Sequence, residues 1–141
     1  MPAADLEAGL VAFLKADAEL ATLVDDRVFG GELPAGQSAS MPRRALVLRP
    51  SGGTSLTGDS HAEYDTQRVD LFGFGATPRE ASRVLRTASL AMRRMRRGVH
   101  GGVLLHSANA ASGVSRGREP GTEWPREFQS FQIFHALEAV A

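Results

Sequence analysis

Residues 77–98, which read TPREASRVLRTASLAMRRMRRG, contain the best-marked helix start in the chain. Thr77 can cap the helix, Pro78 takes the first helical position, and Glu80 follows three residues after the cap. A threonine cap with an acid three residues on is a capping box, and proline at the first position lacks an N–H that would have no helical partner anyway. The segment is therefore predicted to form one helix that runs to about Arg97 and stops at the glycine that follows.

The arginines of this helix gather on one side. At about 100° per residue, six of the seven fall within a wedge about 100° wide. We call these six the arginine stripe: Arg79, Arg83, Arg86, Arg93, Arg94 and Arg97. The opposite side carries Ala81, Val84, Leu85, Ala88, Ala91, Met92 and Met95. A helix of this kind buries its apolar side and exposes the other. The stripe also contains Leu90, which indicates a protein contact there.

The charge of the chain is unevenly distributed. The 141 residues suit a single domain spanning residues 1–141, with 16 basic and 16 acidic side chains. Residues 1–32 hold seven acids against two basic residues, a balance of −5, whereas residues 79–97 hold seven arginines against one acid, a balance of +6. Blocks of opposite sign in one neutral domain predict complementary surfaces, which meet either within one chain or between copies of it.

Three interpretations of the arginine stripe follow. The simplest is a solvated helix face. However, the stripe has no interleaved acids at helical spacing, so its arginines repel one another unless carboxylates or phosphates neutralise them. Carboxylates are favoured over nucleic acid, because the chain is neutral and the stripe carries no aromatic residue for base stacking. The predicted interface therefore combines the stripe with Asp25 and Asp26 of the acidic third.

Composition excludes several classes of site. The chain has no cysteine, which excludes disulfides, thiolate metal sites and cysteine nucleophiles. No segment approaches the roughly 20 apolar residues that span a bilayer, so no membrane partner is expected. The first ten residues, MPAADLEAGL, carry acids where a signal peptide carries positive charge, which favours synthesis in a cytoplasm.

The remaining periodicities predict an α+β domain. Helices are expected over about 5–15 and 17–24, a short extended piece at 27–29, strands at 43–50, 64–75, 101–110 and 127–140, and long polar loops at 51–63 and 112–125. In the second strand the alternation breaks at Leu71–Phe72, which indicates a bulge or burial on both faces. This order favours a mainly antiparallel sheet with two main helices packed on it.

No motif supports catalysis, a cofactor or a metal. GVSRG at residues 113–117 matches a serine-hydrolase elbow around Ser115, but no helix can start promptly after it. The strand, glycine turn and helix start at residues 70–80 lack the third glycine of a dinucleotide site and the lysine of a P-loop. The histidines His61, His100, His106 and His135 have no spacing that presents two imidazoles to one metal. The protein is predicted not to be an enzyme.

The overall pattern resembles a known family. LATLVDDRVFGG at residues 20–31 is followed by a proline-preceded strand, MPRRALVL. A strand that runs into a helix comes next, TQRVDLFGFGATPREASRVLRTASLAM, and the chain closes with the alternating strand WPREFQSFQIFHALEAV. Over about residues 5–139, this pattern and order of elements is similar to that of the tail terminator (tail completion) proteins of long-tailed bacteriophages and phage-like gene transfer particles.

That resemblance implies a structural virion protein rather than an enzyme. The family's subunits form a ring, usually hexameric, which caps the finished tail tube, ends its polymerisation and provides the docking surface for the head's connector proteins. Genomic DNA passes through the channel of the ring without sequence-specific binding. The implied location is the head–tail junction of a virion assembled in the host cytoplasm. The alternatives are a head-side connector ring (stopper or adaptor) and a small nucleic-acid-binding protein.

Overall fold

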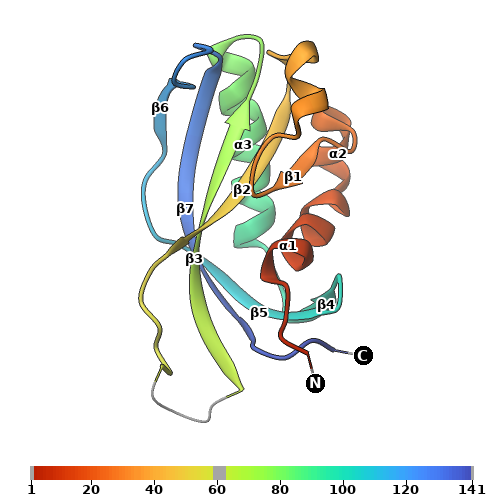
Figure 1. Cartoon of the computed structure of the whole chain (residues 1–141), viewed down its shortest axis with the longest axis vertical. Helices are drawn as coiled ribbons and strands as arrows, with labels where there is room; N and C mark the ends of the chain where they lie inside the picture. Colours follow the sequence, from red (N-terminus) through yellow and green to blue (C-terminus); the bar gives the residue numbers. More distant parts are fainter. Residues whose placement is uncertain (1, 59–62, 141) are drawn as a thin grey trace.

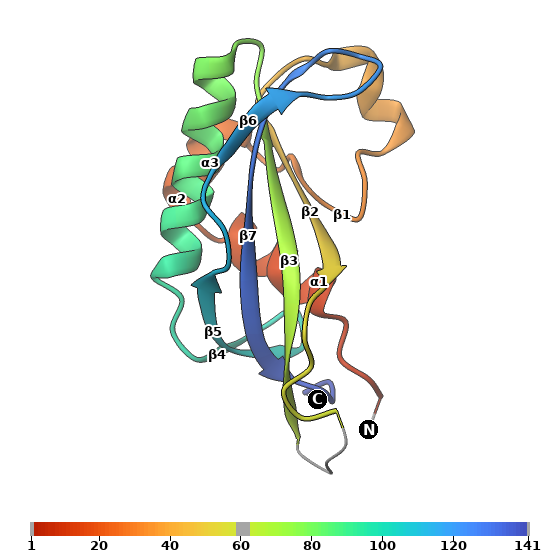
Figure 2. The ribbon, with the colours of Figure 1, turned by 90° about the vertical axis from the view of Figure 1, so that its left-hand side faces the viewer.

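The computed structural model describes residues 2–58 and 63–140, and within them it confirms the α+β prediction. The three α-helices pack on one face of a mainly antiparallel, seven-stranded sheet (Figures 1 and 2). The elements are α1 (Leu6–Lys15), α2 (Ala18–Val24), β1 (Val28–Gly30), the 3-10 helix η1 (Ala35–Ser40), β2 (Ala45–Gly52), β3 (Tyr64–Phe74), α3 (Pro78–Arg93), β4 (Gly98–His100), β5 (Val103–Ala110), β6 (Ser115–Arg118) and β7 (Pro125–Ala136). The strand order is β1-β2-β3-β7-β5-β4, and β6 pairs with β7.

The three α-helices begin where side chains cap them. The Asp5 carboxylate accepts a hydrogen bond from the Ala8 amide at 3.1 Å, and the Asp17 carboxylate accepts one from the Leu20 amide at 2.9 Å. The Thr77 hydroxyl accepts one from the Glu80 amide at 3.2 Å. Each cap satisfies an amide that has no partner inside its helix. These are the starts that the sequence predicted.

Helix α3 ends earlier than predicted. The last helical residue is Arg93, and Arg94 is the C-cap, so the expected extension to Arg97 is wrong. The Met95 amide donates to the Met92 carbonyl at 3.1 Å, which tightens the chain into a turn. The chain leaves the helix here because residues 98–100 pair with β5 as strand β4.

Two long strands form the centre of the sheet. β3 and β7 run antiparallel, with Val69 opposite Phe131, and β2 lies antiparallel to β3 on its other side. The predicted pair of strands joined by a long connection across residues 51–63 is therefore confirmed for β2 and β3. Strand β7 begins two residues before its predicted start and ends at Ala136, so Leu137 lies outside it and is exposed.

Two strands were not predicted. β6 lies within residues 112–125, which were expected to form a loop, and it pairs with the first part of β7, with Arg116 opposite Glu127. β4 forms a hairpin with β5 across Gly101 and Gly102, both with positive φ. A two-residue glycine turn matches the twist of the flanking strands.

The sheet is buried on both faces near its centre. Between helices and sheet, Leu10, Leu85 and Phe131 are fully buried members of the larger core cluster. On the opposite face, Phe72 and Phe74 pack in a second cluster with Phe29, Met41, Trp124 and Phe128. The break in alternation at Leu71–Phe72 thus reflects burial on both faces.

Glycines let α3 approach β3 closely. A Cβ at Gly73 would lie 2.9 Å from the Ala81 carbonyl oxygen, and one at Gly75 would lie 2.5 Å from the Ala81 amide nitrogen. Side chains at these positions would therefore collide with the backbone of α3. These glycines therefore serve the close packing of α3 on β3.

The two ends of the chain meet. The Ala4 amide donates to the Leu137 carbonyl at 2.9 Å, and the Ala139 amide donates to the Pro2 carbonyl at 2.8 Å. Both ends lie at the end of the molecule opposite the N-terminus of α3 (Figures 1 and 2).

Asp65 organises part of the connection between β2 and β3. Its carboxylate accepts hydrogen bonds from the Ser55 hydroxyl and from the amides of Leu56, Thr57 and Thr66. The Ser55 hydroxyl, followed by these amides, lowers the pKa of Asp65 from 3.8 to about 2. The predicted loop 51–63 is thus partly ordered, although residues 59–62 of that prediction lie outside the described residues.

Replacing Asp65 with alanine should loosen this connection. Because the folded-state pKa lies below the ordinary value, the stabilisation by the carboxylate is complete above about pH 4 and is lost as pH falls toward about 2. The protection of the Leu56 and Thr57 amides against hydrogen exchange, taken relative to the intrinsic exchange rate at each pH, should therefore fall between pH 4 and pH 2 in the natural chain. In the Asp65→Ala variant exchange at these amides should already be fast at pH 6. Equal exchange in the two proteins at pH 6 would contradict this.

Candidate functional site

The arginine stripe is exposed along its whole length. Arg79, Arg83, Arg86 and Arg93 lie on the outer side of α3, as the helical wheel predicted. The opposite side of the helix is buried, including Val84, Leu85, Ala88 and Met92. Arg94 and Arg97 are exposed too, but they lie beyond the last helical residue, so the helical-wheel projection does not apply to them.

The stripe has no carboxylate partner within the described residues. Five ion pairs are present in that part of the chain, and none includes a stripe arginine. Arg86 instead donates from Nε to the Ser82 carbonyl at 3.3 Å. Within the described residues, no carboxylate of the acidic N-terminal third therefore forms an ion pair with the stripe.

Asp25 and Asp26 form an exposed turn between α2 and β1, which we call the aspartate turn. The Asp25 carboxylate lies 3.2 Å from Nη1 of Arg27, and its side chain is 78% exposed. Asp25 has φ 55° and ψ −117°, a conformation of tight turns that glycine adopts most easily. Holding a side chain there costs about 1–3 kcal/mol.

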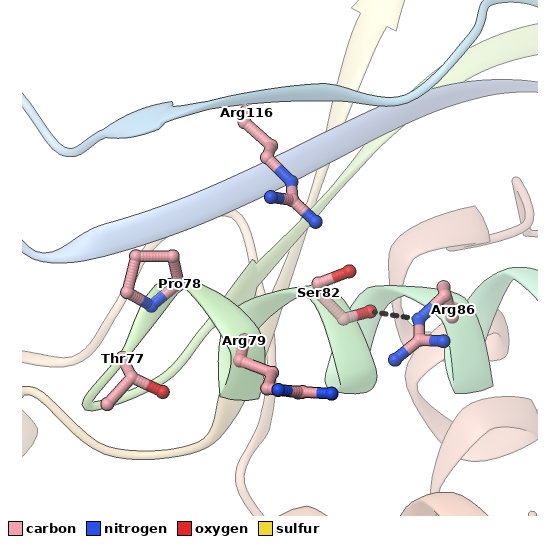
Figure 3. Close-up of a pocket in the computed structure, with 6 residues that line it drawn as sticks. All are labelled: Thr77, Pro78, Arg79, Ser82, Arg86 and Arg116. Carbon is pink, nitrogen blue, oxygen red and sulfur yellow. Dashed lines mark hydrogen bonds between the residues drawn. The ribbon is translucent and has the colours of Figure 1, made fainter.

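A cleft between α3 and β6 brings three arginines together (Figure 3). Arg79 and Arg86 line it from the helix and Arg116 from the strand, and its volume is about 610 Å³. Thr77, Pro78 and Ser82 complete the lining. We call this the arginine cleft. Arg83, Arg93, Arg94 and Arg97 do not line it.

Arg116 is held by a buried acid. Its Nε lies 3.3 Å from Oε2 of Glu127, whose side chain is only 5% exposed. The guanidinium of Arg116 points from β6 toward α3 (Figure 3). Glu127 thus offsets one of the three positive charges through an ion pair without a hydrogen bond, and the Arg116 side chain stays 69% exposed. Arg79 and Arg86 have no counter-ion within the described residues.

The arrangement is suited to binding an anion. Guanidinium groups present planar, paired donors that match carboxylates and phosphates, and these charge-assisted hydrogen bonds are the stronger kind. The sequence prediction missed Arg116 because it assigned residues 112–125 to a loop. The alternation of Arg116 and Arg118 was the available signal for a strand there.

The other candidates do not form sites. Ser115 is the first residue of β6, and no helix follows it, so the elbow geometry is absent. His100 packs edge-on against Phe13, and His106 against Tyr64 and Phe134, while His61 lies outside the described residues. In residues 2–58 and 63–140 there is no group of three or more His, Asp or Glu side chains that could hold a metal ion. Over the same residues no helix combines the length and apolar character needed to cross a membrane.

Comparison with known proteins shows a similarity of fold. The fold is similar to that of a chain in the solved structure of the virion of a native gene transfer agent (GTA) particle, with a TM-score of 0.72. The match covers 93% of this chain and 94% of that chain, at 17% sequence identity, and at this identity the likeness shows a shared fold. No protein-family model matches the chain, and neither does any curated protein sequence.

Proposed function

We propose that this chain is a structural virion protein of a phage or phage-like particle, and specifically a tail terminator. In this role its subunits form a ring, most simply a hexamer, that caps the tail tube, ends tube polymerisation and joins the tail to the head connector. The observation that carries the proposal is the shared fold, over 93% of the chain, with a component of a gene transfer agent virion.

The charge distribution supports a ring. The exposed stripe lacks carboxylate partners within the described residues, and the exposed aspartate turn lies elsewhere on the surface. Two different surfaces that complement each other give a head-to-tail contact, and repeating such a contact generates a closed ring when the rotation closes. The subunit contact would then join the stripe of one copy to Asp25 and Asp26 of the next.

The remaining partners follow from this role. One face of the ring would contact the tail tube protein and the other the head connector protein, at the head–tail junction of the virion. Genomic DNA would pass through the channel without sequence-specific contacts. A ring of this kind needs no catalytic centre, cofactor or metal.

The proposal predicts that the purified protein arrests tube growth. Growing tail tubes incubated with it should become shorter on average, and electron microscopy should show ring-shaped density on tube ends. Bovine serum albumin at equal concentration is the control. If the protein binds isolated head connectors and leaves tube length unchanged, the terminator role is wrong and a head-side connector ring replaces it. If it instead shifts DNA in a gel at low salt and releases it steeply as salt rises, it is a nucleic-acid-binding protein.

A further inference from the structure

We infer that the arginine cleft is the socket for the aspartate turn of a second copy of this chain. The inference rests on the proposed ring and names the contact that holds neighbouring subunits together. It differs from the contact between the whole arginine stripe and the aspartate turn described under the proposed function. It adds Arg116 of β6, and among the stripe arginines it gives the central role to Arg79 and Arg86.

The cleft is prepared for carboxylates. Arg79 and Arg86 are seven residues apart on one side of α3, which is roughly 10 Å along the helix. Arg116 faces them from β6 (Figure 3), and its Nε lies 3.3 Å from Oε2 of Glu127. Two adjacent carboxylates could each meet guanidinium groups within one such cleft.

The aspartate turn has the features of the occupant. Asp25 and Asp26 are adjacent, exposed and at the tip of a turn. Asp25 keeps a carboxylate at φ 55° and ψ −117°, where glycine would relieve the backbone strain. Its neighbour Arg27 offsets part of the charge but is mostly buried, at 16% side-chain exposure, and its Nε donates to the Arg44 carbonyl.

Within one subunit the aspartate turn and Arg116 lie on different strands of the sheet, and no ion pair among the described residues joins Asp25 or Asp26 to an arginine of the cleft. The aspartate turn leads into β1 at one edge of the sheet, whereas Arg116 lies in β6, with β2, β3 and β7 in between. Four strand spacings of about 4.8 Å separate the edges by roughly 19 Å. A second copy is favoured over nucleic acid because the chain carries as many acids as bases, so its own acidic surface complements the cleft in charge.

Self-association measured by sedimentation velocity, without tail tubes, tests the inference. Arg79→Ala should weaken association by about tenfold or more, since it removes one member of an interfacial charge pair. Arg116→Ala/Glu127→Gln should do the same without leaving a buried charge unpaired. Arg118→Ala is the matched control, because this exposed arginine of β6 lies outside the cleft and donates to the Glu123 carbonyl. Its association should stay within about twofold of the natural chain.

Asp25→Gly separates binding from folding. It should weaken association as much as Arg79→Ala, yet its melting temperature should equal or exceed that of the natural chain, because glycine relieves the strain at this position. The double variant Arg79→Ala/Asp25→Gly should associate no more weakly than either single variant, since both remove the same contact.

The outcomes also separate this inference from the proposed function. If the loss of association in the double variant is the product of the losses in the two single variants, Arg79 and Asp25 do not meet, and the inference is overturned. A natural chain that stays monomeric at high concentration overturns it as well. Rings that respond to these variants but leave tube growth unchanged support the socket and reject the terminator role. If the rings cap tubes and the variants associate as strongly as the natural chain, the terminator role is supported and the socket is rejected.

Discussion

A mixture of two charge-reversed variants should assemble into rings that neither variant forms alone. The first variant, Arg79→Glu/Arg86→Glu, makes the arginine cleft acidic. The second, Asp25→Gly/Asp26→Lys, makes the aspartate turn basic. Each variant alone brings like charges together at every contact, which costs several kcal/mol per interface. In an equimolar mixture, each reversed cleft can meet a reversed turn, and each natural cleft can meet a natural turn.

The mixed ring must alternate the two variants, so it closes only with an even number of subunits. A hexamer with three copies of each satisfies this condition. Native mass spectrometry of the mixture should therefore show equal numbers of the two chains, while each variant alone should remain monomeric. Both variants should fold, because their substitutions lie at exposed positions and glutamate at position 79 favours the helix N-terminus. Folded variants that stay monomeric when mixed would show that the cleft and the turn are not partners.

Replacing Phe131 with alanine should remove a large part of the stability of the fold. Phe131 is fully buried, lies in the middle of β7 opposite Val69, and belongs to the core between helices and sheet. Truncating a buried phenylalanine costs about 3–5 kcal/mol, because the cavity cannot fully collapse. A domain of this kind is stable by about 5–15 kcal/mol, so the midpoint of urea denaturation should fall sharply.

Phe134→Ala is the matched control in the same strand. Phe134 lies three residues further on, is only half-buried, and stacks on Tyr64 with ring centres 5.6 Å apart. Its loss removes ring contacts with Tyr64 and His106, each worth about 0.5–1.5 kcal/mol, and leaves no enclosed cavity. Equal losses for the two variants would contradict the assignment of Phe131 to the core.

Local chemistry made much of the fold predictable. The caps Asp5, Asp17 and Thr77 act through residues three positions away, so their effect is readable from the sequence alone. Alternation in the long strands was readable for the same reason. β6 was missed because it has only four residues, all exposed, and depends on pairing with β7. The end of α3 was misplaced because β4 follows it and pairs with β5, and the Gly101–Gly102 turn that joins these strands was assigned to the start of the strand at 101–110.

The candidate site was predictable only in part. The wheel placed Arg79, Arg83, Arg86 and Arg93 on the exposed side, because helical periodicity determines which side of α3 faces the core. The cleft could not be predicted, since Arg116 is 30 residues from Arg86 and reaches it through the sheet. Whether the acidic third meets the stripe within one chain or between copies was open from the sequence, and the described residues form no ion pair between the two within one chain.

The meeting of the two chain ends has a practical consequence. Pro2 and Ala139 are joined by a backbone hydrogen bond at the end of the molecule remote from the start of α3. An affinity tag or fluorophore fused at either end would therefore be attached at nearly the same place on the domain, away from the arginine cleft. Labels on neighbouring subunits would report on ring geometry while leaving the cleft free.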